Sequence, residues 1–220
     1  MRTILAASLV VVALITGVAG VGAQTIDDAK LDQTILDLQH RWAVIQYQTP
    51  ENQREDAFAT LAKDAHAASL AFPGKAEPLV WEGIILSSYA GAKGGFGALS
   101  LVKEAKAVLE KASAINADAM RGSIYTTLGT LYFKVPGWPI GFGNDTKAKE
   151  NFKKALALNP DGLDPNYFHG DYLLDQGDFT GAVKAFEKAI ASPDRPKRPL
   201  ADKGRRAAAR EKLAEARSHI

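Results

Sequence analysis

AKENFKKALALNP, which runs from Ala148 to Pro160, returns 34 residues later as AVKAFEKAIASPD, from Ala182 to Asp194. Alanine, phenylalanine and alanine occupy the same three places in both stretches, at spacings of four and then three residues. These spacings put the three side chains on one face of a helix. The repetition predicts successive amphipathic helices that pack through a small–large–small stripe.

Two weaker copies of this pattern lie upstream. AKAVLEKASAINA, Ala105 to Ala117, has leucine in the central place. In LAKDAHAASLAFP, Leu61 to Pro73, the corresponding places are held by Leu61, Ala65, Ala68 and Pro73. A partner helix repeats as well: PGKAEPLVWEG, Pro73 to Gly83, and PDGLDPNYFHG, Pro160 to Gly170, share two prolines and a glycine at equal spacings. A glycine inside a helix costs about 1 kcal/mol relative to alanine. Its recurrence therefore predicts close contact between paired helices.

A helix–turn–helix unit of 34 residues with this pattern resembles the tetratricopeptide repeat. The resemblance predicts an all-α, tetratricopeptide-like α-solenoid of about three helix–turn–helix units, preceded by an N-terminal helical pair and followed by a C-terminal capping helix. The expected repeat units are residues 73–117, 118–160 and 161–194, and the expected capping helix is 198–220.

A longer resemblance covers the chain beyond the generic repeat. The stretches from Leu128 to Leu174 and RPLADKGRR, Arg198 to Arg206, resemble exported bacterial tetratricopeptide proteins related to the T component of TRAP transporters. The resemblance implies a helical periplasmic protein without catalytic activity that contacts a partner or a ligand.

The N-terminus has the pattern of a signal peptide. Arg2 precedes an apolar run from Ile4 to Val18, and Val21 and Ala23 are the small residues expected at a cleavage site before Gln24. We expect residues 1–23 to be removed and residues 24–220 to form one periplasmic domain. The alternative is an uncleaved N-terminal membrane anchor, because Ile4 to Ala23 carries no charge and is about long enough to span a bilayer.

Composition and motifs argue against several classes of function. A formal net charge of +2 gives no general attraction for nucleic acid, and zero cysteines exclude disulfides and thiolate metal sites. The four histidines (His40, His66, His169, His219) have no short metal-ligand spacing, and no nucleophile motif is present. We expect no enzyme activity, no cofactor and no metal, and we expect His169 to be a buried structural residue.

Two expected units have their helix–helix turn opened by an insertion. One insertion contains Gly95-Phe96-Gly97, and the other contains Trp138 and Gly141-Phe142-Gly143. GGFGALS lacks the lysine and hydroxyl of a phosphate-binding loop, so we expect a glycine turn with Phe96 held against neighbouring helices. Trp138 and Phe142 either fold back onto the repeats or contact a partner. Asn144 begins a formal glycosylation sequon, and we expect Asn144 or Asp145 to cap the following helix instead.

The inner helix of each unit is expected to line a concave groove. Counting by helical turns from each glycine predicts these groove residues: Val80, Ile84, Ser87, Thr126, Thr130, Phe133, Tyr167, Asp171 and Leu174. This mixed lining suits an extended peptide or a small amphiphilic molecule better than DNA.

The predicted function is binding or scaffolding of a protein or peptide partner in the cell envelope, through the groove and the two glycine–aromatic loops. The alternative is a small-molecule-binding accessory component of a TRAP-type transporter, which predicts an enclosed apolar pocket near Val80, Ile84, Phe133 and Trp138. Residues 194–220 carry nine Lys/Arg and four Asp/Glu. We interpret this basic tail as a solvated cap, with attraction of acidic partners or anionic membrane as the other interpretation.

Overall fold

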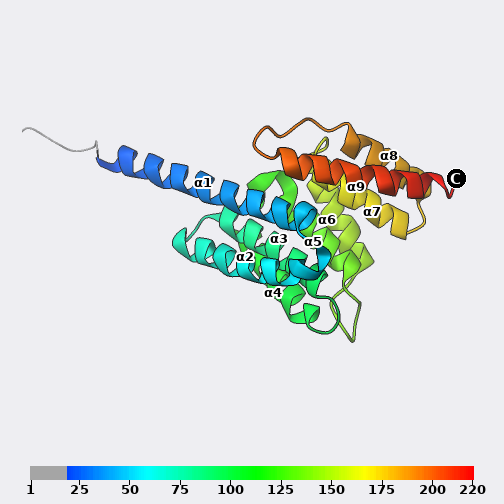
Figure 1. Cartoon of the computed structure of the whole chain (residues 1–220), viewed down its shortest axis with the longest axis horizontal. Helices are drawn as coiled ribbons and strands as arrows, with labels where there is room; N and C mark the ends of the chain where they lie inside the picture. Colours follow the sequence, from blue (N-terminus) through cyan, green and yellow to red (C-terminus); the bar gives the residue numbers. More distant parts are fainter. Residues whose placement is uncertain (1–18) are drawn as a thin grey trace, which may run out of the picture.

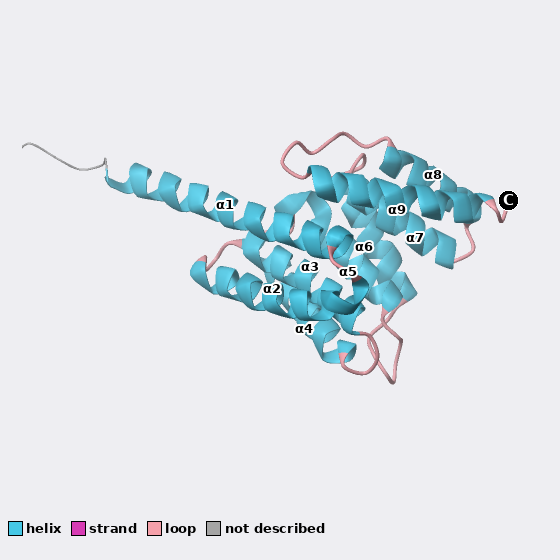
Figure 2. Ribbon diagram, viewed as in Figure 1, coloured by secondary structure: helices cyan, strands magenta, loops and turns pink. Residues whose placement is uncertain are grey.

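The computed structural model describes the backbone of residues 19–220 and the side chains from Asp27 onward. Over this range the chain forms only helices (Figures 1 and 2). They are α1 (Ala19–Gln48), α2 (Glu51–Ala71), α3 (Ala76–Lys93), α4 (Ala98–Ile115), the 3-10 helix η1 (Ala119–Gly122), α5 (Ser123–Lys134), α6 (Asp145–Leu158), α7 (Leu163–Asp175), α8 (Phe179–Ile190) and α9 (Pro199–Arg217). The predicted signal peptide, residues 1–23, lies outside the residues whose side chains are described.

The fold is an α-solenoid, as the repeat predicted. Three helical hairpins follow one another: α3 with α4, α5 with α6, and α7 with α8. The pair α1 and α2 precedes them, and α9 follows and packs on α7 and α8. Among the helices of the described range, none is long and apolar enough to cross a membrane.

The recurring glycines bring the two helices of each hairpin together. A Cβ atom at Gly83 would lie 2.5 Å from the Leu109 side chain, and one at Gly170 would lie 2.8 Å from the Phe186 ring. At Gly129 the same atom would meet Phe152 at 3.1 Å. The predicted close contact is confirmed: the large residue of each stripe packs over the glycine of its partner helix.

The small–large–small stripe forms the centre of each hairpin. Its residues are fully buried in all three units: Ala105, Leu109 and Ala112; Ala148, Phe152 and Ala155; Ala182, Phe186 and Ala189. In α2, Leu61 and Ala65 are equally buried, so the first pair uses the same packing. Burial of a phenylalanine or leucine side chain contributes about 1.5–3 kcal/mol, and repeat stacks draw their stability from such contacts.

The turns show why glycine recurs in the two insertions. Gly94 and Gly95 have φ angles of 64° and 57°, which L-residues with side chains rarely adopt. At Gly143, a Cβ atom would collide with the carbonyl oxygen of Val135, so the loop before α6 requires the missing side chain. The side chain of Asn144 caps α6 by accepting a hydrogen bond from the Lys147 N–H at 2.9 Å, as one of the two predicted caps.

Helices α1 and α9 come from the two ends of the described chain and contact each other. Figure 1 shows α1 lying across the front of α3 and α5, with its C-terminal end beside α9. Gly204 of α9 makes this approach close, because a Cβ atom there would collide with the Tyr47 ring of α1. The inner helices of the hairpins are therefore covered by the first and last helices.

Candidate functional site

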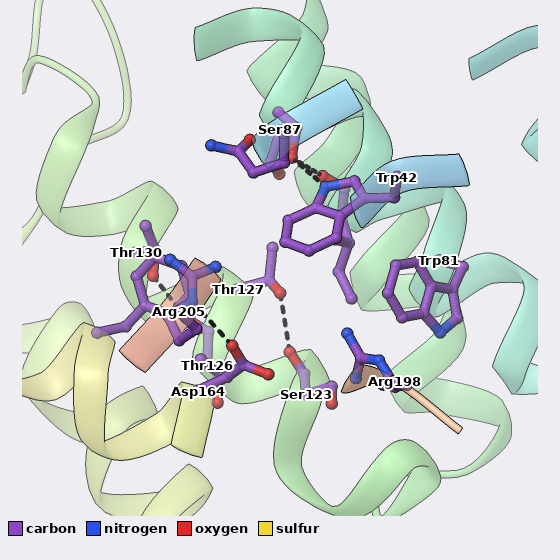
Figure 3. A pocket seen from close by; sticks show the side chains of 14 residues that line it. Trp42, Trp81, Ser87, Ser123, Thr126, Thr127, Thr130, Asp164, Arg198 and Arg205 are labelled. Carbon is purple, nitrogen blue, oxygen red and sulfur yellow. Dashed lines mark hydrogen bonds and ion pairs between the residues drawn. The ribbon is translucent and has the colours of Figure 1, made fainter. Parts of the chain in front are cut away.

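A partly enclosed pocket of about 260 Å³ lies between the inner helices and the two helices that cover them (Figure 3). Its lining comes from α1, α3, α5, α7, α9 and the residue before α9. The lining residues are Trp42, Gln46, Trp81, Ile84, Ser87, Ser88, Ser123, Thr126, Thr127, Thr130, Asp164, Phe168, Arg198 and Arg205. The pocket therefore forms only when helices from both ends of the described chain pack around the inner helices.

Aromatic rings form the apolar part of the wall. The rings of Trp42 and Trp81 meet edge to face, with centroids 6.1 Å apart. The Trp42 indole N–H donates to the Ser88 hydroxyl at 2.8 Å, which fixes the orientation of the ring. Phe168 of α7 contributes a further ring. Flat apolar surfaces of this kind bind rings and aliphatic groups.

Serine and threonine hydroxyls form a second part of the wall, and they present acceptors to the pocket. Each donates its own hydrogen to a backbone carbonyl of the same chain segment, at 2.7–3.0 Å, in Ser87, Ser88, Ser123, Thr126, Thr127 and Thr130. Figure 3 shows the bond that the Thr127 hydroxyl donates to the Ser123 carbonyl. A hydroxyl that has used its hydrogen retains lone pairs that can accept a hydrogen bond.

Charged groups form the third part of the wall. Asp164, in the first turn of α7, accepts from Arg195 at 2.6 Å and from Arg205 at 3.0 Å. Asp202 accepts from the Arg195 Nε at 2.6 Å and from the Arg195 backbone N–H at 2.7 Å. Two carboxylates thus bind two guanidinium groups in one network. The rings of Tyr167 and Phe168 each lie 4.5 Å from the Arg205 guanidinium and shield it further.

Arg198 is different from the other two arginines. Its guanidinium lies 5.2 Å from the Trp81 ring centroid, and its Nε atom is buried without a hydrogen-bond partner. Among the described residues, no carboxylate lies within ion-pair distance of it. Figure 3 shows its guanidinium between Trp81 and Ser123, directed toward the pocket.

The pKa shifts agree with this arrangement. Burial opposes ionisation of Asp164, but Arg195, Arg205 and Arg198 outweigh it and hold the pKa of this carboxyl well below its usual range. Burial also lowers the pKa of Arg198 from its ordinary value, because the attraction of Asp164 is offset by repulsion from Arg195. A bound anion beside Arg198 would favour the charged form of its guanidinium and offset the free-energy cost of burying that charge.

A left-handed segment sets the position of α5 against the pocket. Met120 and Arg121 have φ angles of 53° and 49°, and Gly122 follows at 84°. Left-handed backbone at non-glycine residues costs on the order of 1–3 kcal/mol each. A Cβ at Gly122 would lie 2.9 Å from the Ala155 carbonyl oxygen, so close packing on α6 fixes the segment. Its direct result is that Ser123, the first residue of α5, lines the pocket.

The structure brings four of the predicted groove residues to the pocket: Ile84, Ser87, Thr126 and Thr130. Val80 is instead fully buried in the core, and Leu174 is buried among α7, α8 and α9. Of the expected apolar pocket near Val80, Ile84, Phe133 and Trp138, only Ile84 lines the pocket. The rest of that predicted lining is wrong, because α1 and α9 supply walls that the helix count could not include.

Three predicted groove residues serve other contacts. Asp171 forms an ion pair with Lys134 at 2.8 Å. Phe133 packs on Tyr172, with ring centroids 5.6 Å apart. Tyr167 lies against Arg205, behind the pocket wall.

The loop aromatics do not all behave as expected. Phe96 is 93% exposed and Trp138 is 90% exposed, so the predicted packing of Phe96 is wrong and Trp138 does not fold back. Phe142 does fold back: its ring meets Tyr132 edge to face at 5.6 Å and lies near Lys106 of α4. The two rings of one insertion thus have opposite environments.

Sequence reasoning missed the charged wall because the tail was interpreted as a solvated cap. Arg195, Arg198 and Arg205 point inward toward Asp164 or the pocket, which contradicts that interpretation for these residues. A signal was present: Arg198, Asp202 and Arg205 have the same spacing of four and three residues as the apolar stripes.

Comparison with known proteins identifies the last hairpin. Residues 163–193, which cover the whole of α7 and α8, match the tetratricopeptide repeat family. No curated protein matches the chain. Among the described side chains, no group of three His, Cys, Asp or Glu residues could hold a metal ion.

Proposed function

We propose that this tetratricopeptide-repeat protein is a binding protein without catalytic activity, and that its principal ligand is a small amphiphilic molecule held in the pocket between the inner helices, α1 and α9. The observation that carries this proposal is the lining of that pocket. Aromatic rings, hydroxyl acceptors and an unpaired guanidinium converge on one partly enclosed space. Such convergence of apolar walls with a few oriented polar groups is typical of small-molecule sites.

An extended peptide in the inner groove is less well supported. Tetratricopeptide repeats generally bind proteins, and an open concave face would be the expected place. In this chain α1 and α9 contact each other beside the inner helices, and both contribute to the pocket wall. The remaining space of about 260 Å³ suits a small molecule and not a chain of several residues.

The cellular setting of the proposal follows from the sequence. An N-terminal segment with the pattern of a signal peptide supports export to the periplasm, with cleavage before Gln24. The resemblance of Leu128 to Leu174 to T components of TRAP transporters supports a role in which the protein passes its ligand to a membrane transporter. Binding, release and transfer need no catalytic group.

The test is to identify what the pocket holds. The full chain is expressed with its own N-terminal segment, recovered under native conditions, and examined by native mass spectrometry for a retained small molecule. Thr127→Trp fills the pocket from α5 and is expected to abolish retention, whereas Thr60→Trp on the exposed side of α2 is the matched control. Equal retention by both variants contradicts the proposal, and so does a wild-type protein that neither retains a small molecule nor gains thermal stability from any in a panel.

A second candidate function is contact with a protein partner through the loop tips. It is favoured by the exposure of Phe96, Trp138 and Ile140, of which the first two are almost fully exposed. Exposed aromatic side chains often dominate protein interfaces. A pull-down from periplasmic extract tests it: Phe96→Ala with Trp138→Ala is expected to lose a partner that Thr127→Trp retains. A partner captured equally by both variants contradicts a role for the loops.

A further inference from the structure

We propose that the pocket selects a monocarboxylate of roughly ten non-hydrogen atoms, whose carboxylate pairs with Arg198 and whose flat apolar body lies against Trp42 and Trp81. This inference rests on the proposed small-molecule function and specifies its ligand class. It is carried by the balance of charge, the hydrogen-bonding capacity of the wall and the size of the space.

The first step is the balance of charge. The network beside the pocket contains three guanidinium groups, those of Arg195, Arg198 and Arg205, and two carboxylates, those of Asp164 and Asp202. Asp164 and Asp202 are engaged by Arg195 and Arg205 at 2.6–3.0 Å. One positive charge is left over, and it belongs to Arg198. A single surplus charge in a partly buried site is complemented by a monoanion, since buried charges require a partner.

The second step is the position of Arg198. Its backbone N–H donates to the Arg195 carbonyl at 2.7 Å, and its carbonyl accepts from the Asp202 N–H at 3.0 Å, so the start of α9 fixes the residue. The Trp81 ring covers one side of the guanidinium. The side chain is therefore already oriented for a ligand. A planar guanidinium can bind a carboxylate through two parallel hydrogen bonds.

The third step is the polarity of the remaining wall. Because six hydroxyls have donated their hydrogens to backbone carbonyls, they offer oxygen acceptors and cannot favour a second anionic group. The Asp164 carboxylate, which is paired with Arg205, lines the same pocket and would repel a second anionic group. A ligand carboxylate therefore has one favourable position, and any hydroxyl or amino group on the ligand would face α3 and α5.

The fourth step is size. A cavity of roughly 150 Å³ holds benzene, which has six non-hydrogen atoms. The pocket volume of about 260 Å³ then corresponds to roughly ten such atoms. Phenylacetate and its neutral analogue phenylacetamide both have about this size, and the amide has an uncharged NH2 group in place of one carboxylate oxygen, which makes them matched probes.

The experiment measures binding of these two probes to the full chain by isothermal titration calorimetry. We expect phenylacetate to bind more tightly than phenylacetamide. Arg198→Gln should weaken phenylacetate about 10- to 100-fold, as expected for loss of a charged hydrogen bond, and should leave phenylacetamide nearly unchanged. Arg198→Lys should retain part of the preference. Arg210→Gln removes an exposed arginine of α9 and should change neither affinity.

Circular dichroism during thermal unfolding establishes that each variant is folded before it is titrated. The inference is overturned if phenylacetamide binds as tightly as phenylacetate, if Arg198→Gln and Arg210→Gln behave alike, or if the wild-type protein binds neither probe at millimolar concentration. Retention of a neutral molecule that Thr127→Trp loses would overturn the choice of a carboxylate and still support the proposed function. If the protein shows no preference for phenylacetate and also retains no small molecule that Thr127→Trp loses, both proposals are contradicted.

Discussion

At the scale of single residues, glycine decides how closely the paired helices approach. Gly83, Gly129 and Gly170 each lie under the large side chain of the partner helix. Gly91, in the same helix as Gly83, has no atom within 4 Å of a Cβ position. The same residue type therefore has a packing role at some positions and none at another.

This difference gives a paired prediction. Gly170→Ala should lower the free energy of unfolding by about 1–3 kcal/mol, because its Cβ overlaps the fully buried Phe186 ring. Gly91→Ala should raise it by about 0.5–1 kcal/mol, since alanine favours the helix and meets nothing. Urea unfolding followed by circular dichroism measures both. A Gly170→Ala protein as stable as Gly91→Ala would contradict the packing argument.

A second residue-scale prediction concerns pH. Burial lowers the pKa of His169, although Asp178 partly offsets it, and the ring lies near Phe152. The unfolded chain takes up a proton near pH 6.5, whereas the folded chain does so only at a lower pH. The unfolding free energy should therefore fall as the pH drops below about 6.5. His169→Gln should show a smaller fall between pH 7.5 and pH 5, and an unchanged fall would contradict the assignment.

At the scale of elements, the loop between α5 and α6 has one buried face and one exposed face. Phe142 packs on Tyr132, and Trp138 points into solvent. Treating the two rings as one recognition element is therefore incorrect. The loop is held by Phe142 and by its glycines, and it presents Trp138.

Substitution of Trp138 and substitution of Phe142 should have different effects on the free energy of unfolding. Trp138→Ala should change the unfolding free energy by less than about 0.5 kcal/mol, as expected for an exposed side chain. Phe142→Ala should lower it by about 1–3 kcal/mol, which is below the 3–5 kcal/mol typical of a fully buried phenylalanine. Thermal or urea unfolding of the single variants measures the difference. Equal effects of the two substitutions would contradict a loop in which Phe142 is packed and Trp138 is exposed.

At the scale of the whole molecule, the first and last helices close the solenoid over its inner face. Tyr47 of α1 lies against Gly204 of α9, and both helices line the pocket with the three inner helices. His40 of α1 also contacts the Lys197 carbonyl at 2.6 Å, next to Arg198. The pocket therefore depends on contacts between residues about 160 positions apart in the chain.

Separation of α1 from α9 should expose the pocket to solvent. Gly204→Leu is expected to separate α1 from α9, because a side chain there overlaps the Tyr47 ring. In a Trp138→Phe background only Trp42 and Trp81 remain as tryptophans. Gly204→Leu should then increase quenching of their fluorescence by acrylamide, whereas Gly91→Leu should not. Equal quenching in the two variants would contradict the role of α1 and α9 as a cover.

The sequence alone determined the repeat and its packing. Spacings of four and three residues place alanine, phenylalanine and alanine on one helical face, and the matching glycines identify the partner helix. These relations are local, because helical periodicity places residues within one or two turns of each other. The fold class, the hairpins and their stripe followed from this periodicity, as did four lining residues, Ile84, Ser87, Thr126 and Thr130.

Only the tertiary structure decided how the concave face is used. Whether α1 and α9 leave the inner helices open or cover them depends on contacts such as that between Tyr47 and Gly204, which no local period encodes. The same contacts turn Arg198 and Arg205 inward, so a basic tail that looked solvated becomes the charged wall of a pocket. The physical reason is that the charge of a side chain is written in the sequence, whereas the partner that neutralises it, or its absence, is set by residues far away along the chain.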